Sequence, residues 1–204
     1  ASLNSDPDVE YAEPDYIVSC SALPDDPYFT DGKLWSMHNT GQLTGIPGTT
    51  KQVAGTPDAD IDAPEAWNIR TSADDIVVAV VDTGIYYNHN DLKDNMWINT
   101  GEIPGNKKDD DGNGYIDDVY GINTIVPQDN IKAGNPLDDN KHGTHVAGII
   151  GGSGNNSIGV AGVAWKVKLM AVKFLNRAGK GYTSDAIQAV DYARQMGADI
   201  INCS

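Results

Sequence analysis

The feature that most constrains the fold is a strand, helix, strand pattern near the carboxyl end of this 204-residue chain. Lys168 to Leu175 is a largely apolar run, and Thr183 to Met196 has small apolar residues at helical spacing, with a threonine or serine as N-cap and Gly197 as C-terminal cap. Asp199 to Cys203 is a second strand. Because connections this short around a helix require parallel strands, the pattern predicts a parallel sheet.

A third predicted strand, Ile76 to Val81, is continuously apolar and mostly β-branched, as in strands that helices cover on both faces. We therefore expect an α/β fold in which helices sandwich a parallel sheet. Leu43 to Asp60, rich in Gly, Thr and Pro, is predicted to be a surface loop.

The chain is strongly acidic, with a formal net charge of -15, which disfavours nucleic acid and anionic membranes as partners. No apolar stretch reaches membrane-spanning length. Cys20 and Cys203 lack the spacing of a disulfide framework or zinc site, so both are expected to be free thiols. Cations fit this composition better as ligands.

The two ends predict that the chain is a piece of a longer precursor. The first ten residues contain neither a starting Met nor a signal pattern, and the chain stops directly after a predicted strand. Ala1 to Pro27 is acidic and interrupted by prolines, with one short strand expected at Tyr16 to Val18.

Asp82, in the tripeptide Asp82-Thr83-Gly84, follows a predicted buried strand. Parallel sheets place functional groups at such strand ends, although an aspartate can also merely cap a turn. It could be half of a carboxylate pair or the orienting acid of a serine triad. A carboxylate-pair protease needs a second such motif, and neither a second DTG nor a DSG is present.

His142 begins the stretch "HGTHVAGIIGG", whose small residues allow a helix to start close to the sheet. This places the imidazole near Asp82 and suits a base held by a carboxylate. His142 and His145 could also form a metal pair, but no HExxH pattern or nearby cysteine accompanies them. His145 is expected to be packed within the helix.

Asp82-Thr83-Gly84 and His142 to Gly148 together resemble the Asp and His blocks of the subtilisin-like serine proteases. The similarity starts at Pro24 to Phe29 and continues through Asn155 to Leu175 and Gly197 to Ser204. It implies a subtilisin-like fold, with 24–204 as the first half of the peptidase domain. His142 would be the general base, and Asp82 would orient it.

The family's nucleophile lies in a Gly-Thr-Ser-Met-Ala block that does not occur in this sequence. The resemblance therefore implies that the nucleophilic serine lies outside this chain and that the 204 residues alone are inactive. A rival hypothesis is a non-catalytic calcium-binding module that recognises peptides and has lost the serine.

The resemblance also implies substrate and calcium sites. Gly179, Lys180 and Gly181 match an edge that binds extended polypeptide, although a flexible loop is the alternative, and Ser204 matches the start of a second edge. The family's tight Ca²⁺ site, with a further ligand found in some members, matches Asp26, Asp91, Asn156, Ile158 and Val160.

A second calcium loop is predicted from spacing in "DDDGNGYIDD". Position 12 is Tyr120, where an EF-hand has glutamate, so a solvated acidic loop is the alternative. The expected ligands are Asp109, Asp111, Asn113, Tyr115 through its carbonyl, and Asp117.

Residues 1–23 resemble the end of a subtilisin-like propeptide, an intramolecular inhibitor, with a simple acidic linker as the alternative. The resemblance thus implies a secreted zymogen whose mature form hydrolyses polypeptides through an acyl-enzyme.

Overall fold

The computed structural model describes residues 22–45 and 48–204. The strand expected at Tyr16 to Val18, residue Cys20 and most of the predicted propeptide segment lie outside these residues. No helix in the described part of the chain is both long and apolar enough to cross a membrane.

A four-stranded parallel sheet forms the centre of the molecule, in the order β4-β5-β3-β6. Its central strands are β3 (Ser72–Asp82) and β5 (Lys166–Lys173), flanked by β4 (Gly121–Asn123) and β6 (Ile200–Cys203). The parallel sheet expected from the crossover pattern is thus confirmed.

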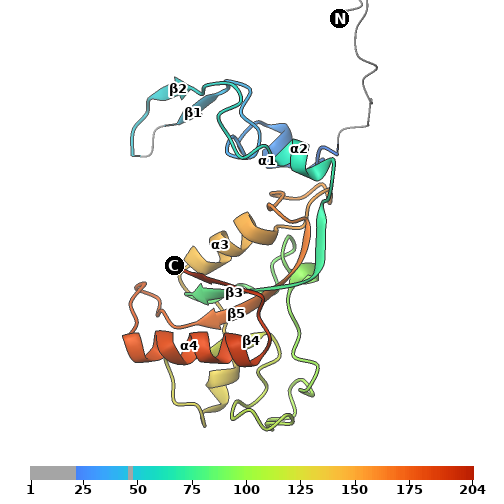
Figure 1. The fold of residues 1–204 in the computed structure, drawn as a ribbon. Coiled ribbons are helices and arrows are strands. Elements are labelled where there is room, and N and C mark those ends of the chain that lie inside the picture. Colours follow the sequence, from blue (N-terminus) through green and yellow to red (C-terminus); the bar gives the residue numbers. More distant parts are fainter. Residues whose placement is uncertain (1–21, 46–47) are drawn as a thin grey trace, which may run out of the picture.

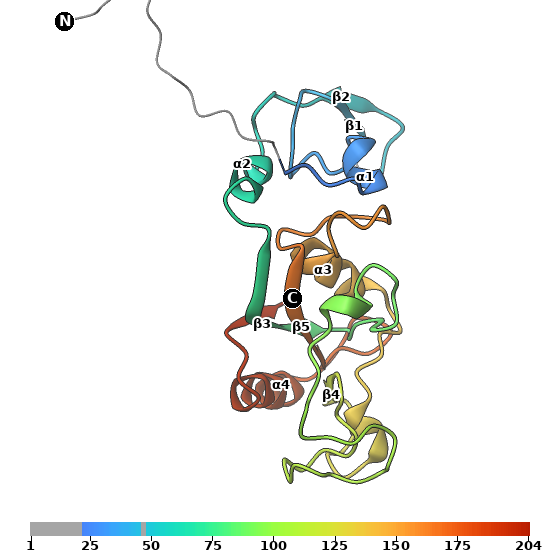
Figure 2. The same cartoon turned by 90° about the vertical axis from the view of Figure 1, so that its right-hand side faces the viewer.

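Helices cover both faces of this sheet because side chains along a strand point alternately to opposite sides. On one face, Val78 and Val80 of β3 belong to a core that includes Ala147 of α3 (His142–Gly151). On the other, Val77, Ala79 and Val81 belong to a core with α4 (Thr183–Gln195). Figures 1 and 2 show α3 and α4 on opposite sides of the sheet.

The start of α4 differs from the prediction. Tyr182, not a threonine or serine, is the N-cap residue, and its N–H donates to the Asp185 carboxylate over 3.3 Å. The N–H of Asp185 donates to the carbonyl of Tyr182 over 3.1 Å, so a first-turn donor that a cap hydroxyl would satisfy already has a partner. Gly197 follows the helix with φ +80°, as expected for a C-terminal glycine.

An N-terminal layer packs above α3, as seen in Figure 1. It contains α1 (Pro27–Thr30), the antiparallel strands β1 (Leu43–Gly45) and β2 (Gln52–Ala54), and α2 (Ala63–Trp67). The prediction of an irregular loop over 43–60 is therefore wrong in part. The segment lies at the surface as expected, but β1 and β2 pair as antiparallel strands of a hairpin.

The long connection from β3 to α3 carries two short 3₁₀ helices, η2 (Lys93–Asn95) and η3 (Ile131–Gly134), on either side of β4. This connection brings the acidic stretch around Asp109 beside the carboxyl end of α4, where Asn113 contacts Met196, and returns the chain to the end of β3. The start of α3 therefore lies beside Asp82.

Candidate active site and cation sites

Asp82 and His142 form a hydrogen-bonded pair where β3 ends and α3 begins. The Asp82 side chain is fully buried, and its two oxygens lie 2.9 and 2.8 Å from His142 Nδ1. The Thr83 N–H also donates to Asp82 over 2.5 Å. The structure thus brings together the two residues that sequence analysis selected as the catalytic pair.

Two glycines permit this approach. Gly84 has φ +98°, and a Cβ there would lie 2.2 Å from the carbonyl oxygen of Pro136. A Cβ on Gly143 would lie 2.2 Å from the carbonyl oxygen of Gly84 and 3.1 Å from Asp82 Cβ. The first turn of α3 therefore meets the end of β3 backbone to backbone, a contact that no other residue type allows.

Nδ1 of His142 is hydrogen-bonded to Asp82, and the side chain of His142 is more than half exposed to solvent. Its side chain is 55% exposed, although its Asp82 partner is fully buried. When Nδ1 carries the proton toward Asp82, Nε2 is left as an acceptor, as general base catalysis requires. The arrangement can take up a proton and stabilise the resulting imidazolium.

His145 does not pack within the helix as predicted; it is exposed. It lines a pocket of about 870 Å³ between α3 and the N-terminal layer, with Met37 and Ile149. The prediction failed because the apolar face of α3 that packs on the sheet carries Ala147, and His145 lies outside that face.

Asp138 ties these elements together. Its Oδ1 accepts hydrogen bonds from the Thr83 hydroxyl (2.9 Å) and from the N–H groups of Asn140 (2.8 Å) and Lys141 (3.0 Å). Its Oδ2 accepts from the N–H and hydroxyl of Thr144. Partial burial opposes ionisation, but these hydrogen bonds outweigh it and hold the pKa of Asp138 below its ordinary value.

Lys173 is a buried cation at the end of β5. Its ammonium donates to the carbonyl of Thr83 (2.6 Å), the carbonyl of Leu175 (2.8 Å) and the Asp139 carboxylate (2.7 Å). Only 5% of its side chain is exposed, so the contacts satisfy a charge that burial would otherwise penalise. Lys173 thereby ties the end of β5 to Thr83, which follows β3, and to Asp139 in the loop before α3.

The predicted substrate edge lies in an exposed turn between β5 and α4. The N–H of Asn176 donates to the carbonyl of Lys180, and the N–H of Lys180 returns to the Asn176 side chain. Both backbone groups of Lys180 and the N–H of Gly179, which donates to the carbonyl of Asn176 over 2.8 Å, are therefore used inside the turn. Ser204 follows β6, with its N–H on the carbonyl of Val81.

The first predicted calcium site brings Asp26 and Asp91 to the loop that contains residues 155–160. Asp26 is fully buried; its Oδ2 accepts from the Asn155 N–H over 2.6 Å, whereas its Oδ1 has no partner among the described residues. Asp91 accepts hydrogen bonds from the Asn156 side chain and the Val160 N–H, both over 2.9 Å.

The charge balance of this corner favours a cation. Burial raises the pKa of Asp26, and the nearby charge of Asp91 adds to the rise. A buried carboxylate with an unpaired oxygen is costly, and a hard cation with oxygen ligands relieves that cost. These residues therefore fit Ca²⁺. Ile158 lies in the same loop with its N–H on the Asn156 side chain.

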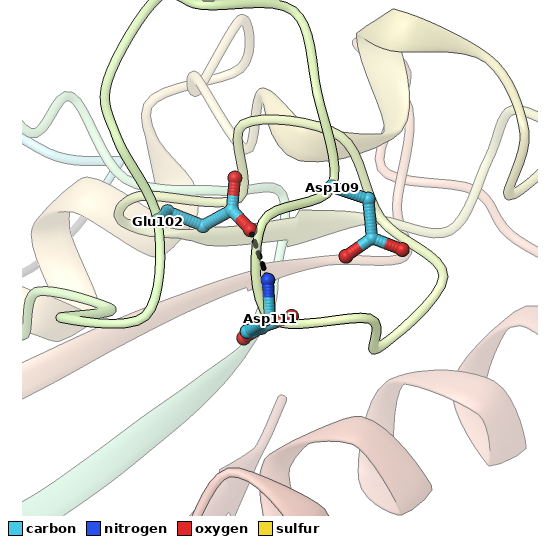
Figure 3. A group of neighbouring side chains, drawn as sticks. All are labelled: Glu102, Asp109 and Asp111. Atoms are coloured by element: carbon cyan, nitrogen blue, oxygen red, sulfur yellow. Dashed lines mark hydrogen bonds between the residues drawn. The ribbon is translucent and has the colours of Figure 1, made fainter.

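The second acidic region differs from the predicted loop. Figure 3 shows Glu102, Asp109 and Asp111 converging, with one ligand oxygen from each within 4.8 Å of the others. This group could hold a metal ion. Sequence analysis missed Glu102, which precedes the loop at no motif spacing. The fold reveals it, because its Oε1 accepts from the N–H groups of Asp110 and Asp111 and its Oε2 accepts from the N–H of Asp117.

Of the remaining predicted ligands of this loop, the Asn113 side chain lies beside the acidic group, whereas the Asp117 carboxylate binds backbone N–H groups. Asn113 lies with Asp111, to which it donates over 3.1 Å. Asp117 is engaged elsewhere, because its oxygens accept from the N–H groups of Gly105 and Lys107. Tyr115 is buried, with its N–H on the Asn113 side chain, which leaves its carbonyl role untested.

Comparison with known proteins identifies the class. Residues 73–204 match the model of the subtilase family, described as Peptidase S8, and the chain belongs to this family.

Three curated proteins that are similar in sequence to this chain are also described as proteases. The chain is 47% identical over 128 residues to subtilisin-like protease 1 of Plasmodium falciparum, covering 62% of this chain and 18% of that protein. It is 32% identical to the thermophilic serine proteinase of Bacillus sp. (strain AK1), covering 100% of this chain and 38% of that protein. The halolysin-like extracellular serine protease Nep of Natrialba magadii is 29% identical, with 97% and 28% covered.

The fold also has a solved counterpart. The serine protease of Aeromonas sobria, solved in complex with a chaperone, superposes with a TM-score of 0.61 at 21% identity, covering 88% of this chain and 25% of that one. The match supports the predicted subtilisin-like α/β fold. The chain spans between 18% and 38% of the length of the three curated relatives.

Proposed function

We propose that residues 24–204 form the first part of the catalytic domain of a secreted, calcium-stabilised serine endopeptidase. The observation that carries the proposal is the hydrogen bond between buried Asp82 and exposed His142 at the carboxyl end of a central parallel strand. Membership of the subtilase family supplies the reaction class.

In the proposed mechanism, His142 Nε2 takes the proton of a serine hydroxyl that lies outside these 204 residues. The serine oxygen attacks the peptide carbonyl, and His142 then gives the proton to the departing amine, leaving an acyl-enzyme. Water, deprotonated by the same nitrogen, releases the acid and restores the serine. Asp82 holds the ring and stabilises the imidazolium in both steps.

Polypeptide substrates would lie against the exposed turn that carries Gly179, Lys180 and Gly181, with Ser204 at the start of the opposing edge. Support comes from the geometry of this turn, because Asn176 closes it and leaves the two glycines at its surface. Residues 1–23 would belong to an inhibitory propeptide.

Calcium would be held first by Asp26, Asp91 and the loop at Asn156, Ile158 and Val160. The unpaired buried oxygen of Asp26 supports this assignment. Asp109 and Asp111, with Glu102 and neighbouring Asn113, would hold a second ion. When bound, the ions supply cross-links between segments that are distant in sequence. An extracellular setting, where this ion is plentiful, fits the extracellular relative.

A histidine comparison in the full-length protein tests the catalytic assignment. His142→Ala should abolish propeptide release and labelling by a serine-directed phosphonylating reagent, because the base that activates the serine is gone. His145→Ala, which removes an exposed histidine three residues away on the same helix, should mature and label normally. Normal maturation of His142→Ala would refute the triad.

A further inference from the structure

Asp138 lies between the two elements that carry the candidate catalytic pair. Its Oδ1 accepts from the Thr83 hydroxyl over 2.9 Å, and its Oδ2 accepts from the Thr144 N–H over 3.1 Å. Thr83 follows Asp82 at the end of β3, whereas Thr144 lies in the first turn of α3. One carboxylate therefore joins the strand that supplies the acid to the helix that supplies the base.

Thr83 extends this connection to the residue after His142. Its hydroxyl accepts from the Gly143 N–H over 2.9 Å while it donates to Asp138. The direction is fixed, because an N–H can only donate and an ionised carboxylate can only accept. The hydroxyl proton must point to Asp138, and a lone pair must point to Gly143.

The loop before α3 is held by the same carboxylate. The N–H groups of Asn140 and Lys141 donate to Asp138 Oδ1 over 2.8 and 3.0 Å. The Asn140 side chain in turn accepts from the His142 N–H over 3.2 Å. Lys141 has φ +93°, a conformation that a non-glycine residue adopts only when its surroundings impose it.

We propose that Asp138 is a positioning residue of the protease, which sets the distance between His142 and Asp82 by clamping the start of α3 to the end of β3 through Thr83 and Thr144. The inference rests on the proposed function, since it gives Asp138 a part in the same reaction. Asp138 acts through its neighbours and not on substrate, because its oxygens face Thr83, Thr144 and its own loop.

Only an all-acceptor side chain of this size satisfies the arrangement. In Asp138→Asn, an amide NH₂ replaces one oxygen and would face N–H donors whichever way the group is turned. If it replaces Oδ1 it meets Asn140 and Lys141, and if it replaces Oδ2 it meets Thr144. The loop must then move, and His142 moves with it.

A spectroscopic test measures the geometry without turnover. In the full-length protein, the His142 Nδ1 proton that is hydrogen-bonded to Asp82 should give a low-field proton NMR resonance. Asp138→Asn should shift this resonance or broaden it beyond detection. Asp129→Asn, which removes an exposed carboxylate, should leave it unchanged. An unchanged resonance in folded Asp138→Asn would overturn the inference.

Kinetics provide the second readout, with variants that keep the side-chain volume. Thr83→Val and Asp138→Asn should each lower kcat by about 100-fold with KM within about twofold, because misplacing the base affects the chemical step more than binding. Thr83→Ser keeps the hydroxyl and should recover most of the activity. Thr83→Val with wild-type kcat would also overturn the inference.

The two readouts separate the positioning role from the proposed function. If Asp138→Asn shifts the resonance but no form of the full-length protein cleaves a peptide, the clamp is confirmed and the protease assignment fails. If all forms cleave equally with equal resonances, the protease assignment stands and the clamp is refuted.

Discussion

Asp138, which is partly buried, and Asp26, which is fully buried, are both carboxylates shielded from solvent, but their oxygens are satisfied in different ways. Asp138 collects N–H and hydroxyl donors from Thr83, Thr144 and its own loop, and its pKa is held below the ordinary value. Asp26 has one oxygen without a partner among the described residues, and burial raises its pKa.

The protein's own donors satisfy both oxygens of Asp138, whereas one oxygen of Asp26 is left for the cation that we propose. Asp138 stabilises the fold as an anion. Asp26 costs stability as an anion until a positive charge reaches it. The group of Glu102, Asp109 and Asp111 is intermediate in how far its oxygens are satisfied. The loop supplies several of its own N–H groups to oxygens of Glu102 and Asp109.

The largest expected effect is that of calcium removal. Saturating Ca²⁺ at about 1,000 times its Kd would stabilise the fold by about 4 kcal/mol, so a chelator should lower the Tm by about 10 °C in a domain of this size. Differential scanning calorimetry of the full-length protein with and without chelator measures this. An unchanged melt would remove both proposed sites.

The effect of Asp26→Asn on the Tm should depend on calcium: the Tm should fall when Ca²⁺ is present and should not fall in chelator. In saturating Ca²⁺ the substitution removes a ligand and should lower the Tm by about 5 °C. In chelator it removes an unpaired buried charge, and the Tm should equal or exceed that of the wild type. Asp129→Asn is the matched control for loss of one acidic charge and should show neither change. A drop of equal size in both conditions would assign Asp26 a purely structural role.

The loss of Tm caused by Asp138→Asn should depend on pH, because the pKa of Asp138 is lowered whereas that of Asp26 is raised. Because the pKa of Asp138 in the folded state is lowered from 3.8, its contribution is present above that pH and disappears as the pH falls through the folded value. The variant should melt about 3 °C below the wild type at neutral pH, and the gap should close in acid as the pH falls through the lowered pKa of folded Asp138. A gap that is constant with pH would show that shape, and not charge, is responsible.

The smallest effect is expected at the acidic loop. Glu102→Gln keeps one carbonyl acceptor for the N–H groups of Asp110 and Asp111. The Asp117 N–H loses the other oxygen of Glu102 but keeps the carbonyl of Lys108, so the Tm should fall by less than about 2 °C. Calorimetric titration should nevertheless show the weaker calcium-binding step lost and the stronger step retained. Loss of both steps would mean that the two sites are coupled or wrongly separated.

The sequence predicted three of the four strands of the sheet, because β3 and β5 are largely apolar runs and α4, which precedes β6, has a clear helical period and a terminal glycine. The edge strand β4 was not predicted, because it has only three residues. The pairing of Asp82 with His142 was also predictable, since each residue lies next to a predicted strand end or helix start. The proposed calcium site at Asp26 and Asp91 came from family resemblance, and the structure adds an unpaired buried oxygen on Asp26 that supports the proposal.

The sequence could not predict contacts that depend on the path of a long connection. Glu102 and Asp138 carry no motif of their own, and only the fold shows which backbone groups they receive. The hairpin at β1 and β2 was missed because its arms are exposed and lack apolar alternation. His145 was misplaced because its orientation depends on how α3 rotates against the sheet.

The backbone contact between Gly84 and Gly143 limits how this protein can be altered in the laboratory. A methyl group at Gly143 would collide with the carbonyl of Gly84, and one at Gly84 would collide with that of Pro136. Random libraries will therefore lose nearly every variant at these two positions. Engineering of the pH response or of the rate should leave both glycines fixed and vary the hydroxyl and carboxylate groups around them.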